Sequence, residues 1–395
     1  MKRIALHAAL CAALTLGAIA MPAHAEGVRP EVGKPLQEAQ RLIKARKGRE
    51  AMAEIAKAEA VPNRTAYENQ IIAQMKAAAS SGSGDNDATI RNNMALLDSG
   101  KAGGEARTLV QGIAVAYYNK KEYGEAAKWT QRYFKEGGSD PAMRAVLLQS
   151  YYLQGDCAAV DHAVNENRAS ETDLQMIEDC YRRKGDSGGY VRAMEALVVN
   201  YPKKEYWTIL LTNVQKKPGF AADRLAVHVY RLRMATGNLS KPEDYMEMAQ
   251  LALQAGVPSE AKEILEKGYE ARVLGSGPDA PREQRLRDLI AKNLAESQKT
   301  RAKDEADALN AKDGNDLVRV GLNYVYEGNA TKGISLVEQG IKKGNLKRPE
   351  DAKLLLGEAE LKAGQKQRAV QMFREVKGSD GTADIARLWV LQARA

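Results

Sequence analysis

The chain has 395 residues, with 59 Lys and Arg against 51 Asp and Glu and a formal net charge of +8 at pH 7. Hydrophobic residues make up 44% of it and charged residues 28%, which is typical of a globular protein in water and excludes collagen, low-complexity disorder and a small disulfide-dense fold. Length alone predicts two or three domains of about 150 residues. An array of repeats has no such limit, because each repeat contacts only its neighbours.

The first 25 residues have the pattern of a secretory signal peptide. A basic start is followed by an apolar run over residues 4–20, and Ala23 and Ala25 are the small residues that precede a cleavage site. The alternative, a membrane anchor, fits less well because an apolar run of about 17 residues is shorter than the ~20 needed to span. We therefore expect residues 1–25 to be removed, Glu26 to begin the mature chain, and the protein to reach the bacterial periplasm.

Small residues recur in pairs twelve positions apart, as expected where two antiparallel helices approach closely. The pairs are Ala114 with Ala126, Ala249 with Ala261, Gly321 with Gly333, and Gly357 with Ala369. Within three of them a glycine follows the first member by seven positions, at Gly256, Gly328 and Gly364. A glycine there can end the first helix in the left-handed conformation, so each pair predicts a helix, a turn and a second helix.

This pattern resembles the tetratricopeptide repeat in a degenerate form. The resemblance is carried by Leu356-Gly357 through Ala369-x3-Phe373, by Val320-Gly321-x2-Tyr324, and by Ala249 through Glu260-Ala261-x3-Leu265. The chain departs from the family where Leu148 and Val160 replace the small pair and where the characteristic tryptophan is mostly missing. The resemblance implies an all-α fold, a right-handed α-solenoid of tetratricopeptide-like helical hairpins that binds partners on its concave face.

Helix-start signals divide the chain into hairpins. Pro141, Pro242 and Pro349 stand where a first helical turn begins, Ser170-x2-Asp173 has the form of a capping box, and no segment reads as a strand. Nine or ten hairpins result, followed by a closing helix over 383–395. Their approximate ranges are 36–60, 64–98, 104–136, 141–168, 171–200, 204–236, 242–273, 282–312, 315–343 and 350–377.

A loop with two prolines marks the clearest boundary between parts of the chain. We place an N-terminal helical repeat array at 26–273, a linker at 274–281, and C-terminal helical repeats with the closing helix at 282–395. The charged segment 282–312 can form one helix or two. A long solvated helix is the preferred interpretation, and a coiled coil that binds a partner is the alternative.

The residues of the usual catalytic and metal sites are scarce. Only His162 and His228 remain after signal cleavage, and the common hydrolase and nucleotide-binding motifs are absent. Basic residues alternate with acidic ones instead of forming a stripe, so nucleic acid is not an expected partner. We therefore expect no enzyme activity, no cofactor and no metal site.

The sequence favours a protein-binding scaffold or adaptor of a bacterial cell-envelope complex, peripheral to the membrane at most. The alternative is a module that binds anionic polysaccharide or peptidoglycan. Helical spacing along the first helices of three successive hairpins predicts a partner-binding strip with tyrosine anchors. The predicted strip residues are Gln111, Tyr118, Asn119, Gln149, Tyr152, Gln175, Arg182 and Arg183, with Val115 and Asp179 on the same face. For Tyr118 and Tyr152 the alternative role is to fill packing gaps.

Two cysteines remain once the signal peptide is removed, Cys157 and Cys180. They should lie on neighbouring antiparallel helices at heights that differ by only ~3 Å, from a rise of 1.5 Å per residue. An even pair in an oxidising compartment predicts a disulfide between them. Two buried free thiols are the alternative.

Overall fold

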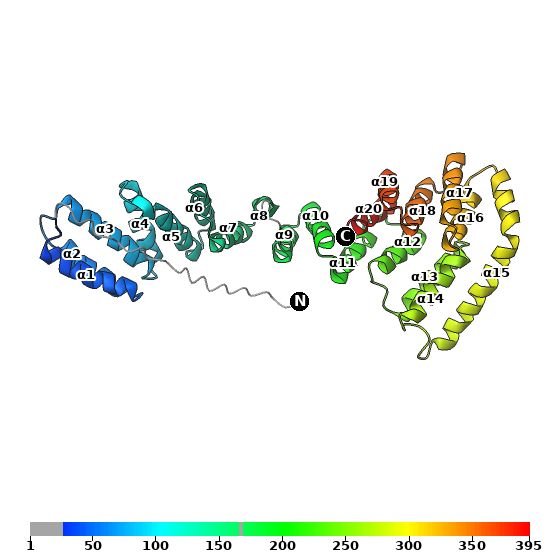
Figure 1. The fold of residues 1–395 in the computed structure, drawn as a ribbon, viewed down its shortest axis with the longest axis horizontal. Coiled ribbons are helices and arrows are strands. Elements are labelled where there is room, and N and C mark those ends of the chain that lie inside the picture. The colour runs from blue at the N-terminus through cyan, green and yellow to red at the C-terminus, as the bar shows by residue number, and fades with distance from the viewer. Residues whose placement is uncertain (1–26, 166–168) are drawn as a thin grey trace. The chain divides into compact units, whose positions relative to one another are not determined.

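The computed structural model describes residues 27–165 and 169–395, and every regular element within these ranges is a helix (Figure 1). The expected signal peptide, residues 1–25, lies outside the described residues. The chain divides into two compact units, Met1–Asp186 and Ser187–Ala395. Within each unit every helix packs against the next one in the sequence, which is the neighbour-to-neighbour packing of an α-solenoid. The all-α prediction is confirmed.

Unit 1 contains nine α-helices in its described part, joined by short turns. They are α1 (Pro30–Lys44), α2 (Gly48–Glu59), α3 (Ala66–Ser81), α4 (Asn86–Asp98), α5 (Ala106–Asn119), α6 (Tyr123–Lys135), α7 (Pro141–Gln154), α8 (Cys157–Asn165) and α9 (Glu171–Lys184). A short 3-10 helix, Gly103–Glu105, precedes α5. The first helices of two successive hairpins, α5 and α7, also contact each other directly. Two of the three helices that carry the predicted strip therefore pack side by side.

Unit 2 contains eleven helices, one of them much longer than the rest. They are α10 (Ser187–Asn200), α11 (Lys204–Gln215), α12 (Ala222–Ala235), α13 (Pro242–Gln254), α14 (Pro258–Glu270), α15 (Ala280–Asn310), α16 (Asn315–Tyr326), α17 (Ala330–Lys343), α18 (Pro349–Lys362), α19 (Lys366–Glu375) and α20 (Thr382–Gln392). The charged segment 282–312 thus forms one helix and not two, because α15, of 31 residues, covers it as far as Asn310.

The last helix, α20, returns to the beginning of unit 2. It packs against α10 and α12 as well as α18, and Figure 1 shows it beside α12. Ion pairs reinforce this closure: Arg387 meets Glu195 at 2.6 Å, and Lys217 meets Asp384 at 2.5 Å. Because α10 and α12 precede α20 by more than a hundred residues, unit 2 closes on itself where an open solenoid would continue.

The helix-start predictions hold. Asp140 accepts a hydrogen bond from the second residue of α7, and Pro141 occupies the first helical position. Ser170 and Asp173 exchange side-chain-to-backbone hydrogen bonds of 3.1 Å, which completes the predicted capping box. These bonds satisfy backbone N–H groups that have no partner within the helix.

The paired small residues allow helices to approach as expected. A Cβ atom added at Gly333 would lie 2.5 Å from the carbonyl oxygen of Gly321, and one added at Gly357 would lie 2.5 Å from the ring of Phe373. Gly328 has a φ of 90°, which a residue with a side chain rarely adopts. The glycines thus set both the distance between α16 and α17 and the turn that joins them.

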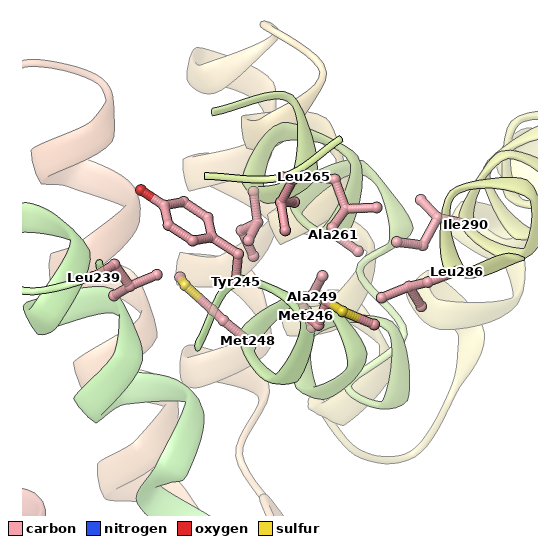
Figure 2. Packing of buried hydrophobic residues seen from close by; sticks show 12 residues of the cluster. Leu239, Tyr245, Met246, Met248, Ala249, Ala261, Leu265, Leu286 and Ile290 are labelled. Carbon is pink, nitrogen blue, oxygen red and sulfur yellow. The ribbon is translucent and has the colours of Figure 1, made fainter. Parts of the chain in front are cut away.

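The core of α13, α14 and α15 shows how these helices pack. Ala249 and Ala261 are fully buried between α13 and α14, and Leu286 and Ile290 project from α15 onto them (Figure 2). Leu274 from the loop before α15 is buried in the same cluster. The segment 274–281, which the sequence places between two domains, therefore lies inside unit 2.

The two compact units divide at a different place from the boundary expected at 274–281. They separate between Asp186 and Ser187, in the turn between α9 and α10, so the expected hairpin 171–200 contributes one helix to each unit. Pro278 and Pro281 mark a loop, and a loop with prolines does not by itself show whether the helices on its two sides share a core.

A disulfide joins Cys157, the first residue of α8, to Cys180 in α9. The Cα atoms are 5.6 Å apart and both side chains are buried. The two helices pack against each other, as the height argument requires. The bond links the last hairpin of unit 1 to the helix that follows it.

Candidate functional site

The predicted strip begins on α5 and α7, where three of its residues form hydrogen bonds between the two helices or to the cap of α7. Gln111 donates a hydrogen bond of 3.1 Å to Asp140, the residue that caps α7. Tyr118 donates its hydroxyl hydrogen to the side chain of Gln149. Burial raises the pKa of Tyr118, so its hydroxyl stays protonated and able to donate. These contacts connect successive first helices through side chains that are only half-buried.

The same arrangement recurs between α7 and α9. Tyr152 donates to Asp179, which also forms an ion pair with Arg182. The guanidinium of Arg183 lies 5.2 Å from the centre of the Tyr152 ring, within the range of a cation–π interaction. Both arginines are exposed, whereas Tyr152 and Asp179 are half-buried. At this point the strip therefore presents the positive charge of Arg183 to solvent above the Tyr152 ring.

Two predicted strip residues lie apart from these pairs. Asn119 is exposed, and its amide lies 3.4 Å from Asn86 at the start of α4, so it faces the preceding hairpin. Gln175 is half-buried on α9. Six of the eight predicted residues take part in contacts between α5 and α7, between α7 and α9, or within α9. The structure also shows that the tyrosine hydroxyls bond to neighbouring helices, as the packing alternative requires.

Unit 2 contains a buried group of charged and polar side chains that sequence reasoning missed. We name it the Arg231 cluster, and its members are His228, Arg231, Glu260, Tyr326, Glu358 and Trp389. These residues come from α12, α14, α16, α18 and α20. Apart from Tyr326, they are no more than 8% exposed.

Arg231 lies between two carboxylates. Its Nε and Nη2 atoms donate to the two oxygens of Glu260, each over 2.6 Å, and its Nη1 atom donates to Glu358 over 2.6 Å. A bidentate pair of this kind is among the stronger hydrogen-bonding arrangements in proteins. One guanidinium thus connects α12 to both α14 and α18.

The other members complete the bonding of the two carboxylates. Glu358 also contacts His228 Nδ1 at 2.8 Å and accepts a hydrogen bond of 3.0 Å from Trp389 of α20. Glu260 accepts a further bond of 2.9 Å from the hydroxyl of Tyr326. Each buried carboxylate therefore has several donors, which offsets its removal from water.

The opposite charges in this cluster stabilise the ionised forms of its carboxylate and guanidinium groups. Burial would raise the pKa of Glu358, but the charges of His228 and Arg231 outweigh burial and hold that pKa below its ordinary value. Burial would lower the pKa of Arg231, but the two carboxylates raise it well above the ordinary value. Burial and the charge of Glu260 raise the pKa of Tyr326, so its hydroxyl remains a donor.

A pocket of about 570 Å³ opens beside the Arg231 cluster, inside unit 2. Its deep part is formed by cluster residues, Trp389 among them, and by the buried apolar side chains of Met248 and Ile264. Its mouth carries exposed lysines from α14, α18 and α19. This volume lies within the range of pockets that hold small ligands or a few residues of a peptide.

Within the described ranges, no group of three or more His, Cys, Asp or Glu side chains is placed to hold a metal ion. In the same ranges, no helix has both the length and the apolarity needed to cross a membrane. The carboxylates of the Arg231 cluster are engaged by neighbouring donors, an arrangement suited to holding five helices together.

No family model matches the sequence, and no curated protein matches it. Among solved structures, the chain is similar to one described as Naa15/Naa10 bound to HypK-THB, with 13% identity, 90% of this chain covered and a TM-score of 0.33. This chain spans 60% of the length of that one. A second is the crystal structure of yeast Tom70, with 11% identity, 92% of this chain and 95% of that chain covered, and a TM-score of 0.26. Such low scores transfer no residue roles, so the fold assignment rests on the helices described above.

Proposed function

We propose that the protein is a non-catalytic scaffold of the bacterial cell envelope that binds protein partners along the strip on α5, α7 and α9. The single observation that carries the proposal is the repeated arrangement of half-buried tyrosines, Tyr118 and Tyr152, on successive first helices. Tyrosine and arginine are enriched at the centres of protein interfaces, because a rigid ring or planar guanidinium gives large contact area with a polar end. Arg182 and Arg183 add exposed guanidinium groups beside the second ring.

A periplasmic location is part of this proposal. It is supported by the signal-peptide pattern of residues 1–25 and by the disulfide between Cys157 and Cys180, since disulfides persist in oxidising compartments. Intact-mass measurement of envelope-purified protein is expected to give a chain that begins at Glu26. A chain that still begins at Met1 would contradict the cleaved-signal proposal.

Binding of an anionic polysaccharide or peptidoglycan is the second candidate function. It is favoured by three consecutive exposed basic residues, Arg182, Arg183 and Lys184, at the end of α9. Basic residues in a last helical turn also interact favourably with the helix dipole, which is a sufficient structural reason for their position. Protein binding is therefore the preferred proposal, and a glycan array separates the two.

The test of the protein-binding function is site-specific photocrosslinking of the full chain in intact cells, followed by mass spectrometry. A photoreactive amino acid at Arg182 or Arg183 reports on the strip, and one at Lys135, exposed on α6, is the matched control. We expect a protein adduct from the strip positions and none from Lys135. Equal adducts at all three positions, or adducts only at Lys135, would reject the strip as the binding surface.

A further inference from the structure

We propose that the pocket beside the Arg231 cluster in unit 2 is a second binding site, which accepts an internal peptide segment carrying an apolar side chain next to an acidic one. This proposal rests on the protein-binding function proposed above, but it concerns a different unit and different residues. The argument comes from the charge at the mouth of the pocket, the chemistry of its floor and the way its walls are held.

The mouth of the pocket has more positive than negative charge. Lys267 and Lys362 share one carboxylate, Glu263, at 2.8 and 2.5 Å. Lys366, at the start of α19, is exposed and forms no ion pair with any residue that the structure describes. The mouth thus has three lysines for one carboxylate. A ligand with acidic groups is favoured there by charge complementarity.

The floor of the pocket combines apolar and polar groups. Met248, Ile264 and Trp389 offer an apolar surface for one side chain. Beside them stand Arg231 and Glu358, whose charges are already paired within the cluster. Half-buried Gln392 also lines the pocket, and a hydrocarbon tail would cover its amide without replacing the contacts of that amide with water, which is unfavourable. A peptide carries N–H and C=O groups that can hydrogen-bond at such a surface, so a peptide fits the floor better than a lipid chain.

The walls of the pocket are fixed in the absence of any ligand. Arg231 ties α12 to α14 and α18, and the bond from Trp389 to Glu358 ties α20 to α18. A site that is already formed loses little conformational entropy on binding, so a modest contact area can give measurable affinity. The closure of unit 2 by α20 therefore has a direct consequence for the site, because Trp389 would leave the floor if α20 detached.

The test begins with a phage-displayed library of random heptapeptides, selected on the full chain. The most enriched peptide is then synthesised with both ends blocked, and its affinity is measured by fluorescence anisotropy. We expect enriched sequences to combine an apolar residue with Asp or Glu. Lys366→Glu should weaken binding by about three- to tenfold, the size expected when an exposed attraction becomes a repulsion.

Two further variants separate the pocket from the rest of the surface. Lys299→Glu makes the same charge change at an exposed position on α15 outside the pocket, and it should leave the affinity unchanged. Ala235→Trp places a large side chain at an exposed residue that lines the pocket, and it should reduce binding at least about tenfold by filling the site. Circular dichroism and the thermal midpoint establish that each variant is folded.

The proposal is overturned if no peptide is enriched on the wild type relative to Ala235→Trp, or if the enriched peptides lack acidic residues. Dodecanoate is the probe for the rival occupant. If dodecanoate binds the wild type and not Ala235→Trp while no peptide is enriched, the site accepts an amphiphile and the peptide proposal is wrong. Photocrosslinking at Arg182 and Arg183 does not depend on this pocket, so failure here is distinguishable from failure of the scaffold function.

Discussion

Replacing Arg231 with methionine removes the only guanidinium between two buried carboxylates. The side chains of Arg231, Glu260 and Glu358 are 6%, 2% and 6% exposed, so water cannot take over the three lost hydrogen bonds of 2.6 Å. Removing one partner of a buried ion pair costs about 3–5 kcal/mol, because the opposite charge is left unpaired. We expect Arg231→Met to lower the free energy of unfolding of unit 2 by this amount.

The measurement is urea unfolding followed by tryptophan fluorescence in a Trp129→Phe background. The two remaining tryptophans, Trp207 and Trp389, both belong to unit 2 and report its unfolding alone. Arg285→Met, which replaces an exposed arginine on α15, is the matched control and should change the stability by less than about 0.5 kcal/mol.

The pH dependence of the variant supplies a second, independent test. In the wild type the pKa of Glu358 is lowered, so its stabilising effect is present above the unfolded pKa and is lost as pH falls through the folded value. Without Arg231, burial should raise the pKa of this carboxyl above its unfolded value. Protonation of Glu358 then removes the unpaired charge. The loss of stability caused by Arg231→Met should therefore become smaller between pH 7.5 and pH 5.

A loss below about 1 kcal/mol for Arg231→Met would refute this account of unit 2. A larger loss that is the same at pH 7.5 and pH 5 would also contradict it, because it would assign the effect to packing and not to unpaired charge. The triple variant Arg231→Met, Glu260→Gln, Glu358→Gln removes the charges together and should recover part of the stability.

Three other predictions concern the remaining structure. Thiol titration of denatured, unreduced protein should find no free thiol from Cys157 and Cys180, and replacing both with serine should destabilise unit 1 by about 3 kcal/mol, from the closure of a loop of this length. Gly333→Ala should lower the stability by about 1–3 kcal/mol, measured by thermal unfolding, because the added Cβ would lie 2.5 Å from a backbone oxygen of α16. An unchanged thermal midpoint would show that α16 and α17 can move apart to accept it. Hydrogen bonds from Arg29 and from the backbone lower the pKa of Glu68 to about 2, so its contribution to the stability of unit 1 should be present above its ordinary pKa and be lost as pH falls towards 2. Acid unfolding followed by circular dichroism should therefore show a weaker pH dependence in Glu68→Gln, and identical curves would contradict this assignment.

Helix boundaries were predictable because their signals are local. Asp140 followed by Pro141, and Ser170 three residues before Asp173, satisfy backbone groups within one turn of the helix they begin. A glycine such as Gly328 ends a helix by its own conformational freedom. None of these effects depends on residues far away in the chain.

Helical spacing predicts the side of each first helix on which Tyr118 and Tyr152 lie. Spacing does not show that their hydroxyls bond to Gln149 and Asp179, since this depends on the lateral distance between helices. For the same reason Asn119, only one residue from Tyr118, faces the preceding hairpin.

The sequence by itself determined the helical hairpins, the close approach of helices at paired small residues, and the cysteine pair, because each depends on residues within about one repeat. The Arg231 cluster and the closure of unit 2 were decided only by tertiary structure. Arg231 and Glu358 are 127 residues apart, and in the sequence each looks like one of many charged residues on a helix. In an array of hairpins the small rotations between neighbours add up to the curvature of the whole, and in unit 2 α20 meets α10 and α12. No local pattern specifies that sum, which is why the buried charges and the pocket beside them appear only in the folded chain.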